Sequence, residues 1–271
     1  GLPFMPEMAG LCGQVFRIRS QPGKTCLDAR PMQMRTFPTR DVFLLAGARC
    51  SGTAHGGCQR ECALFWKRQW LESVTDSPET EGPGSGSASY KDSRSFAPAA
   101  SAAPLASGSE DDTYFCQSTA LSDATTLLSS RGRLSVAWWD WRIGNLDIFQ
   151  LVVRFTGPAW RKILRRLRGV EPRGVLKKTP TANLGLQAGD RVRIKPLAEI
   201  LPTLDVEGRN RGLVFEPDMT NFCSREFRVR RRVDRMISES SGKMISLTNT
   251  VTLEEIVCSC PFTFGGCPRA E

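Results

Sequence analysis

The chain has 271 residues, a formal net charge of +9, ten cysteines and a single histidine, His55. This length allows two small domains and a linker, and the charge favours an anionic partner over a cationic one. One histidine leaves few catalytic arrangements built on imidazole, and ten cysteines are too few for a disulfide-dense scaffold. No apolar run approaches the roughly 18 residues of a membrane span, and no secretory signal is visible, so we expect a cytoplasmic protein without a transmembrane segment.

The first module, residues 1–75, contains a motif that recurs near the other end of the chain. Each copy has a Pro-Glu-Met or Pro-Asp-Met turn, a cysteine, an alternating Phe-Arg-Ile/Val-Arg segment and a Gly-Gly-Cys. These pieces are residues 1–8, Cys12, residues 16–19 and Cys58 in the first copy, and residues 212–219, Cys223, residues 227–230 and Cys267 in the second. A duplication of this kind predicts two related domains. Because residue 1 already lies inside the motif, we expect the first copy to be truncated at its N-terminus.

Two segments of different character separate the modules. Residues 76–112 are rich in Ser, Gly, Ala and Pro, and we expect a disordered linker because they offer little apolar surface to offset the entropy of ordering. Residues 113–185 are predicted to form a helical connector, with a helix from Leu146 to Arg168.

The second module, residues 186–271, has the alternating pattern of half-buried strands. The expected elements are strands over residues 191–195, 226–230, 243–247 and 250–253, a helical turn over 199–204 and a hairpin turn at 240–242. Several short strands with Gly, Asn and Pro turns favour a small barrel, and the first strand resembles the opening strand of SH3-like barrels. We therefore predict a mainly β protein with two small SH3-like barrel modules and a helical connector.

The cysteines predict one metal site in each module. The expected ligands are Cys12, Cys50, Cys58 and Cys62 in the first module and Cys223, Cys258, Cys260 and Cys267 in the second. Four soft ligands suit a structural zinc ion, and four thiolates would also hold an iron–sulfur cluster. Free buried thiols or disulfides within each module are the alternatives.

The single histidine and the positions of the remaining cysteines complete this interpretation. His55 lies in the Gly-rich loop between Cys50 and Cys58 and is a candidate additional ligand or acid–base group. Cys58 and Cys62 are expected at the start of a helix over residues 61–70, where two thiolates would share a face. Cys26 and Cys116 have no counterpart in the second copy and are interpreted as ordinary thiols.

Two basic stretches are candidate anion-binding surfaces. Arg161 and Arg165 lie in an amphipathic segment, which indicates either an anion-binding or membrane-surface helix or a docked helix with a solvated basic face. Arg228, Arg230 and Arg232 lie on and after a strand, where they could contact a phosphate backbone or protect a sheet edge. The aromatic residues that single-strand binding needs are few. The Trp-rich segment 138–141 is expected in a core or an interface.

Several motifs resemble those of a family of uncharacterised bacterial proteins with two cysteine-containing SH3-like repeats. They are residues 1–8, Lys24-Thr25-Cys26, residues 50–58, Phe65-Trp66-Lys67 and Tyr114-Phe115-Cys116-Gln117. The members tend to be encoded among polysaccharide or natural-product genes, so the resemblance implies an accessory role in a biosynthetic pathway and no specific activity. The chain departs from the family at Ser259-Cys260, where the second copy has its own cysteine arrangement.

Together these features predict a metal-stabilised binding or scaffold protein that recognises a peptide, protein or anionic partner. An iron–sulfur redox protein and a nucleic-acid-binding module are the alternatives. No catalytic residue is predicted, because nothing in the sequence ties two of its carboxylates to one site.

Overall fold

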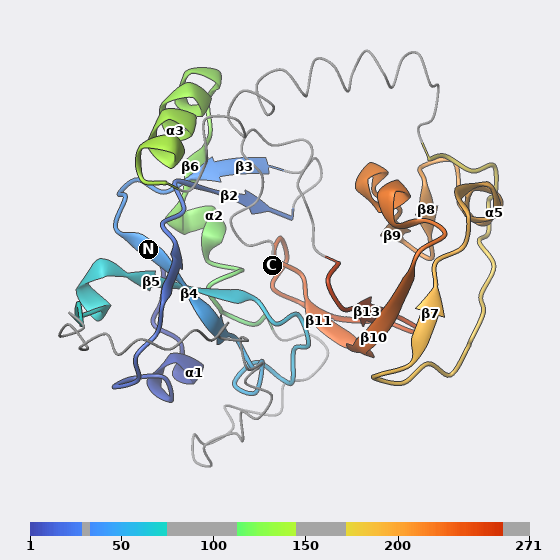
Figure 1. Ribbon diagram of the computed structural model, residues 1–271, viewed down its shortest axis with the longest axis horizontal. Helices are drawn as coiled ribbons and strands as arrows, with labels where there is room; N and C mark the ends of the chain where they lie inside the picture. Colours follow the sequence, from blue (N-terminus) through green and yellow to red (C-terminus); the bar gives the residue numbers. More distant parts are fainter. Residues whose placement is uncertain (29–32, 75–112, 145–171, 257–271) are drawn as a thin grey trace, which may run out of the picture.

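The computed structural model describes four ranges, residues 1–28, 33–74, 113–144 and 172–256 (Figure 1). The described residues are mainly β, as predicted, and form several small antiparallel sheets with few helices. None of these sheets closes into a barrel within the described ranges. None of the helices found there has both the length and the apolar character that a membrane crossing requires. The predicted linker, the helix from Leu146 to Arg168 and three predicted ligands, Cys258, Cys260 and Cys267, lie outside these ranges.

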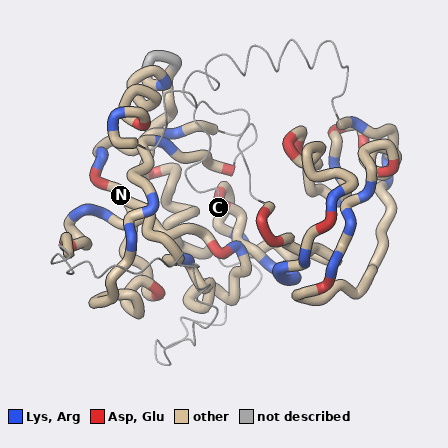
Figure 2. The backbone as a smooth tube through the Cα atoms, in the orientation of Figure 1, with Lys and Arg blue, Asp and Glu red and all other residues tan. Residues whose placement is uncertain are grey.

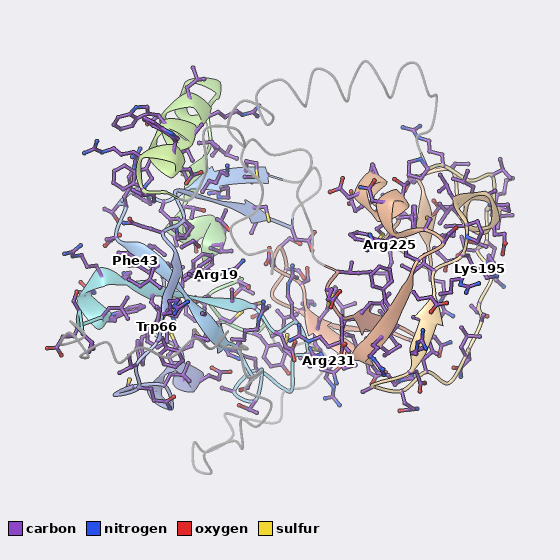
Figure 3. All side chains as sticks on the ribbon, viewed as in Figure 1. Arg19, Phe43, Trp66, Lys195, Arg225 and Arg231 are labelled. Atoms are coloured by element: carbon purple, nitrogen blue, oxygen red, sulfur yellow. The ribbon has the colours of Figure 1, made fainter. Side chains whose placement is uncertain are left out.

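The first half of the molecule is built on a three-stranded sheet in the order β1-β4-β5. The strands are β1 (Ile18–Ser20), β4 (Val42–Arg49) and β5 (Ala63–Lys67). β5 follows β4 in antiparallel register, with Phe43 opposite Trp66, both labelled in Figure 3. The 3-10 turn η1 (Arg68–Trp70) comes directly after β5.

The helix predicted over residues 61–70 is therefore wrong. Residues 63–66, Ala-Leu-Phe-Trp, are all buried and form most of β5. A short continuous apolar run does not distinguish a strand covered on both faces from a buried helix, because neither leaves a periodic pattern. Cys58 and Cys62 consequently share a loop rather than a helix face.

A second three-stranded sheet, in the order β2-β3-β6, shares a hydrophobic core with the first. Its strands are β2 (Lys24–Leu27), β3 (Gln33–Thr36) and β6 (Thr126–Leu127), and the helices α2 (Leu121–Ala124) and α3 (Ser130–Arg142) flank β6 in sequence. Residues of the predicted connector thus belong to the first half, because β6 pairs with β3 and α2 contributes to the core. That core joins residues Leu2, Leu27, Phe37, Val42, Leu44, Ala63, Phe65, Leu121 and Ala124.

A buried glutamine, Gln117, completes the outer edge of β5. Its Nε2 donates to the carbonyl oxygens of Phe65 at 2.8 Å and Pro3 at 2.9 Å, while its Oε1 accepts from the Phe65 N–H at 2.8 Å. The side-chain amide satisfies the backbone groups that a neighbouring strand would otherwise pair.

Replacing Gln117 by alanine is expected to destabilise the protein by about 3 kcal/mol, because the N–H and C=O of the buried Phe65 lose their partner. Urea unfolding of the full chain measures this loss. The control is Gln14→Ala, which removes one exposed hydrogen bond to the Gly10 carbonyl oxygen; its effect should stay within about 0.5 kcal/mol. Equal effects of the two substitutions would contradict the role of Gln117.

The second half contains a three-stranded sheet in the order β13-β10-β7. Four strands lie where the sequence predicted them: β7 (Arg191–Arg193), β10 (Glu226–Arg232), β12 (Met244–Ser246) and β13 (Val251–Leu253). The predicted helical turn is also present, as α5 (Leu197–Ile200) and η2 (Leu201–Thr203). The remaining elements are β8 (Arg209–Asn210), β9 (Leu213–Val214), η3 (Pro217–Phe222) and β11 (Arg235–Ile237).

The two halves share one order of elements. In the first, the helical turn α1 (Pro6–Ala9) precedes β1, and a hairpin of β2 and β3 precedes β4, which pairs with β1. In the second, η3 precedes β10, and a hairpin of β11 and β12 precedes β13, which pairs with β10.

The hairpin of β11 and β12 also joins the two halves (Figure 1). Gln59 donates its N–H to the Arg235 carbonyl oxygen at 3.0 Å and accepts from the Asp234 N–H at its Oε1 at 2.6 Å. Nearby, Arg60 Nη2 lies 3.2 Å from Oε1 of the fully buried Glu239 side chain. The loop after β4 is therefore held from the second half as well as the first.

Candidate metal centre

The loop of residues 50–62 links β4 to β5 and is closed by its own backbone. At its base the Cys50 N–H donates to the Cys62 carbonyl oxygen at 2.9 Å. Inside it, the N–H groups of His55 and Gly57 both donate to the Gly52 carbonyl oxygen at 3.0 Å, and the Cys58 N–H donates to the His55 carbonyl oxygen at 3.2 Å. These bonds hold the side chains of Cys50, His55 and Cys58 in a compact turn.

Two glycines make this turn possible. Gly52 has a φ of +73°, and a Cβ there would lie 1.8 Å from the Cys58 carbonyl oxygen. Gly56 has a φ of +60°, and a Cβ there would lie 2.6 Å from the Tyr114 hydroxyl oxygen. Because L side chains are disfavoured at positive φ and no space is left for one, the sequence needs glycine at both positions.

Glu7 reaches the loop from α1. Pro6 occupies the first turn of α1, where its missing N–H costs nothing, and Met5 and Met8 anchor this turn in a core cluster. The Glu7 carboxylate then points toward His55, with 2.7 Å between Oε1 and Nδ1. Both side chains are almost fully buried, 6% and 5% exposed.

Cys50 completes a group of three potential ligands. Its Sγ lies 3.7 Å from Glu7 Oε1 and 3.9 Å from His55 Nδ1. The three donor atoms lie within 4.8 Å of one another and could hold a metal ion. Tetrahedral zinc places such atoms about 3.4 to 3.6 Å apart, so the sulfur contacts are already near this spacing and only the Glu7–His55 contact must open.

An unpaired oxygen supports this interpretation. Glu7 Oε2 is buried and has no hydrogen-bond partner, although buried polar atoms in proteins are nearly always paired. This oxygen is available to a cation bound by the carboxylate, whose other oxygen, Oε1, faces His55 and Cys50.

A small cavity of about 20 Å³ lies beside the group. That volume is enough for one water-sized particle. Its wall includes His55 and four cysteines, Cys50, Cys58, Cys62 and Cys116. Sulfur and imidazole donors thus line a space of the size of a single ion, and the Glu7 carboxylate contacts two of these residues, Cys50 and His55.

The predicted ligands of the first module are only partly brought together. Cys50, Cys58 and Cys62 line the cavity, and of these three only Cys50 belongs to the close group. Cys58 Sγ accepts from the Ile237 N–H at 3.4 Å, and Cys62 Sγ lies 3.1 Å from Ser118 Oγ. Cys12 lies elsewhere: it is exposed, and its thiol donates to the Met8 carbonyl oxygen at 3.6 Å.

Cys223 makes the contact that Cys12 makes. Its thiol donates to the Met219 carbonyl oxygen at 3.8 Å, again four residues back in the chain. In the described structure, each of these two thiols therefore hydrogen-bonds to a carbonyl oxygen of the helical turn that precedes it.

Two residues of the site were missed from the sequence. Glu7 was not singled out, although an acidic residue occupies the same place in both copies of the repeated motif, as Glu7 and Asp218. Cys116, interpreted as an ordinary thiol, lines the cavity. His55 was a candidate ligand and lies in the close group.

The charges around Cys50 disfavour a free thiolate. Burial, followed by the negative charge of Glu7, raises the pKa of the Cys50 thiol far above its ordinary value. Metal binding must therefore displace this proton. Burial also acts to raise the pKa of Glu7, but hydrogen bonds from His55 and from backbone N–H groups, together with the charge of His55, lower it below its ordinary value.

The same geometry disfavours a nucleophilic relay. In a catalytic triad the nucleophile and the carboxylate contact opposite nitrogens of the imidazole ring. Here Cys50 Sγ and Glu7 Oε1 both face His55 Nδ1. Three donor atoms that converge on one point suit a bound cation. They do not form the relay in which a proton moves from Cys50 to one nitrogen of the His55 ring while Glu7 contacts the other.

Two of the three described arginines of the candidate anion-binding surface lie near carboxylates; Figure 2 draws basic residues in blue and acidic ones in red. Arg230 pairs with Glu61 at 2.9 Å, and Arg232 lies 3.6 Å from Asp234. Arg228 is exposed and donates to the Gly189 carbonyl oxygen at 3.2 Å. Arg161 and Arg165 lie outside the described ranges.

Glu61 also pairs with Arg231, labelled in Figure 3, at 3.1 Å. These ion pairs use charge that a phosphate backbone would otherwise contact, and they connect the loop after β4 to β10.

No protein-family model matches the chain, and no curated protein or solved structure is significantly similar to it.

Proposed function

We propose that this chain is a zinc-stabilised binding or scaffold protein. Glu7, Cys50 and His55 hold the ion, and Cys58 or Cys62 on the same cavity supplies the fourth ligand. The observation that carries the proposal is the convergence of three buried donor atoms beside an ion-sized cavity, with one Glu7 oxygen left unpaired. Zinc at this place would tie α1 to the loop of residues 50–62.

The mixed donor set favours zinc over an iron–sulfur cluster. Zinc accepts thiolate, imidazole and carboxylate together, whereas the common clusters take four thiolates. The close group offers one sulfur, one nitrogen and one oxygen. An iron–sulfur redox protein remains the alternative that the four cavity cysteines support.

The site supports a structural role rather than catalysis. Structural zinc sites are closed, and catalytic ones keep an open position for water or substrate. Glu7 and His55 are almost fully buried, and the cavity holds no more than one water-sized particle. Binding or scaffolding is the role that suits a metal-stabilised fold whose one histidine is buried at the metal site.

We further propose that the second half is a second copy of the same SH3-like module. The shared order of elements and the matching thiol contacts of Cys12 and Cys223 support this. Cys258, Cys260 and Cys267 would then supply ligands for a second ion. The seven cysteines of the described ranges form no disulfide with one another, and we propose a reducing, cytoplasmic environment.

The partner we propose is a protein or peptide in a biosynthetic pathway. We rank nucleic acid as the second candidate partner, because phosphate binding requires cations that are not already neutralised and arginines of β10 pair with carboxylates.

Elemental analysis of the full chain, purified without added metal, tests this proposal. We expect at least one zinc per chain and no iron. Iron with acid-labile sulfide would instead support the redox alternative. A metal-free protein that folds normally would contradict the metal site, and turnover of a substrate by the purified chain would contradict a purely binding role.

A further inference from the structure

The helix α3 is held on the first half by its inner face. Val136 and Ala137 are buried there. Asp140, the only acidic residue in Ser130–Arg142, also points inward, and its Oδ2 lies 3.7 Å from Nζ of Lys24 on β2. Both side chains of this pair are nearly inaccessible to solvent.

A second contact fixes the rotation of the helix. The Arg40 guanidinium stacks 4.4 Å from the centre of the Trp139 ring and donates to Ser135 Oγ at 3.1 Å. With Asp140 anchored on one side and Trp139 on another, the face of α3 that points to solvent is determined by packing.

That outer face carries large apolar side chains. Leu134 is 59% exposed, Trp138 55% and Trp141 43%. Their spacing of four and three residues places them in one stripe along the helix. α3 lies at the outer edge of the first half (Figure 1). A contiguous exposed stripe of this kind marks an interaction surface more often than chance exposure.

The charge near the stripe is positive. The Arg142 guanidinium lies 5.7 Å from the centre of the Trp138 ring, and Arg133 is exposed on the same helix. Because Asp140 is turned inward, no carboxylate of α3 faces solvent. The sequence that follows is also basic: between residues 145 and 171 the acidic residues are Asp147 and Glu171, and the basic ones are Arg154, Arg161, Lys162, Arg165, Arg166 and Arg168.

We propose that the outer face of α3, Leu134, Trp138 and Trp141 with Arg142, binds the surface of an anionic lipid membrane. Tryptophan rings favour the boundary between lipid headgroups and acyl chains, because the ring is apolar and its N–H is polar. Cations at the same depth contact the lipid phosphates. A helix of 13 residues lies in this boundary and does not span the bilayer.

Co-sedimentation of the full chain with vesicles tests the proposal. The vesicles contain phosphatidylcholine with phosphatidylglycerol, and pure phosphatidylcholine vesicles give the comparison. We expect binding to the anionic vesicles that weakens as salt is added. The double variant Trp138→Ser, Trp141→Ser should bind at least about tenfold more weakly, because each ring loses its burial in lipid.

The control is the double variant Val15→Ser, Leu184→Ser, which changes two apolar side chains outside α3 that are each 76% exposed. It should bind as the unchanged chain does. If the tryptophan variant loses its fold by circular dichroism, Arg142→Glu replaces it, and this variant should also weaken binding to anionic vesicles.

Three outcomes would overturn the proposal: no binding of the unchanged chain to anionic vesicles, equal binding of the tryptophan and control variants, or self-association through this face without vesicle binding. The surface is independent of the metal centre, so loss of either proposal leaves the other standing.

Discussion

Replacing Gly52 by alanine is expected to destabilise the chain by about 4 kcal/mol or more and to remove its metal site. The new Cβ would lie 1.8 Å from the Cys58 carbonyl oxygen, and the neighbour is backbone, which cannot rotate away. The loop must then open, and the hydrogen bonds that His55 and Gly57 donate to Gly52 are lost. Urea unfolding and zinc content measure the two effects.

Gly13→Ala is the matched control. Gly13 has nearly the same backbone angle, a φ of +75°, but no atom lies within 4 Å of the position of its Cβ. Its substitution should therefore cost only about 1 kcal/mol, the penalty of the left-handed conformation itself. If Gly52→Ala is no more destabilising than Gly13→Ala, the compact turn described for residues 50–62 is incorrect.

Replacing Cys50 by serine is expected to lower zinc affinity at least about 100-fold, since even the loss of a residue that only supports a ligand costs 10- to 100-fold. Glu7→Gln should also weaken binding, because it removes the negative charge while keeping the size of the side chain. Competition with a fluorescent chelator measures both affinities. The difference in zinc content between the unchanged chain and Cys50→Ser isolates one site even where the chain binds a second ion.

Cys12→Ser separates this site from the one expected from the sequence. Cys12 is exposed and its thiol contacts the Met8 carbonyl oxygen, so its substitution should leave zinc affinity unchanged. If Cys12→Ser weakens binding as much as Cys50→Ser while Glu7→Gln has no effect, the four-thiol site is correct and the mixed site is not.

The strands of the second half were predictable because their polar and apolar residues alternate. β10 illustrates this, with Phe227 and Val229 directed inward between exposed arginines. β5 was not predictable in the same way, since a strand buried on both faces shows a continuous apolar run. Periodicity therefore identifies half-buried elements and does not distinguish among fully buried ones.

Only part of the metal centre could be predicted from the sequence, because the sequence shows the clustering of neighbouring residues and not the contacts that packing creates. Cys50 and His55 are five residues apart, so their clustering is visible in the sequence. Glu7 lies 43 residues from Cys50, and only the packing of α1 against the sheet brings the two together. Cys12 is nearer to Glu7 in sequence but follows the end of a helical turn and points to solvent.

The most direct test of the account is zinc-edge X-ray absorption on the full chain carrying Cys258→Ser, Cys260→Ser and Cys267→Ser, so that the first half supplies the ligands. A site built from Glu7, Cys50 and His55 with one further cysteine gives a mixed shell, with sulfur at about 2.3 Å and nitrogen or oxygen at about 2.0 to 2.2 Å. A shell of four sulfurs, or one without sulfur, would contradict it.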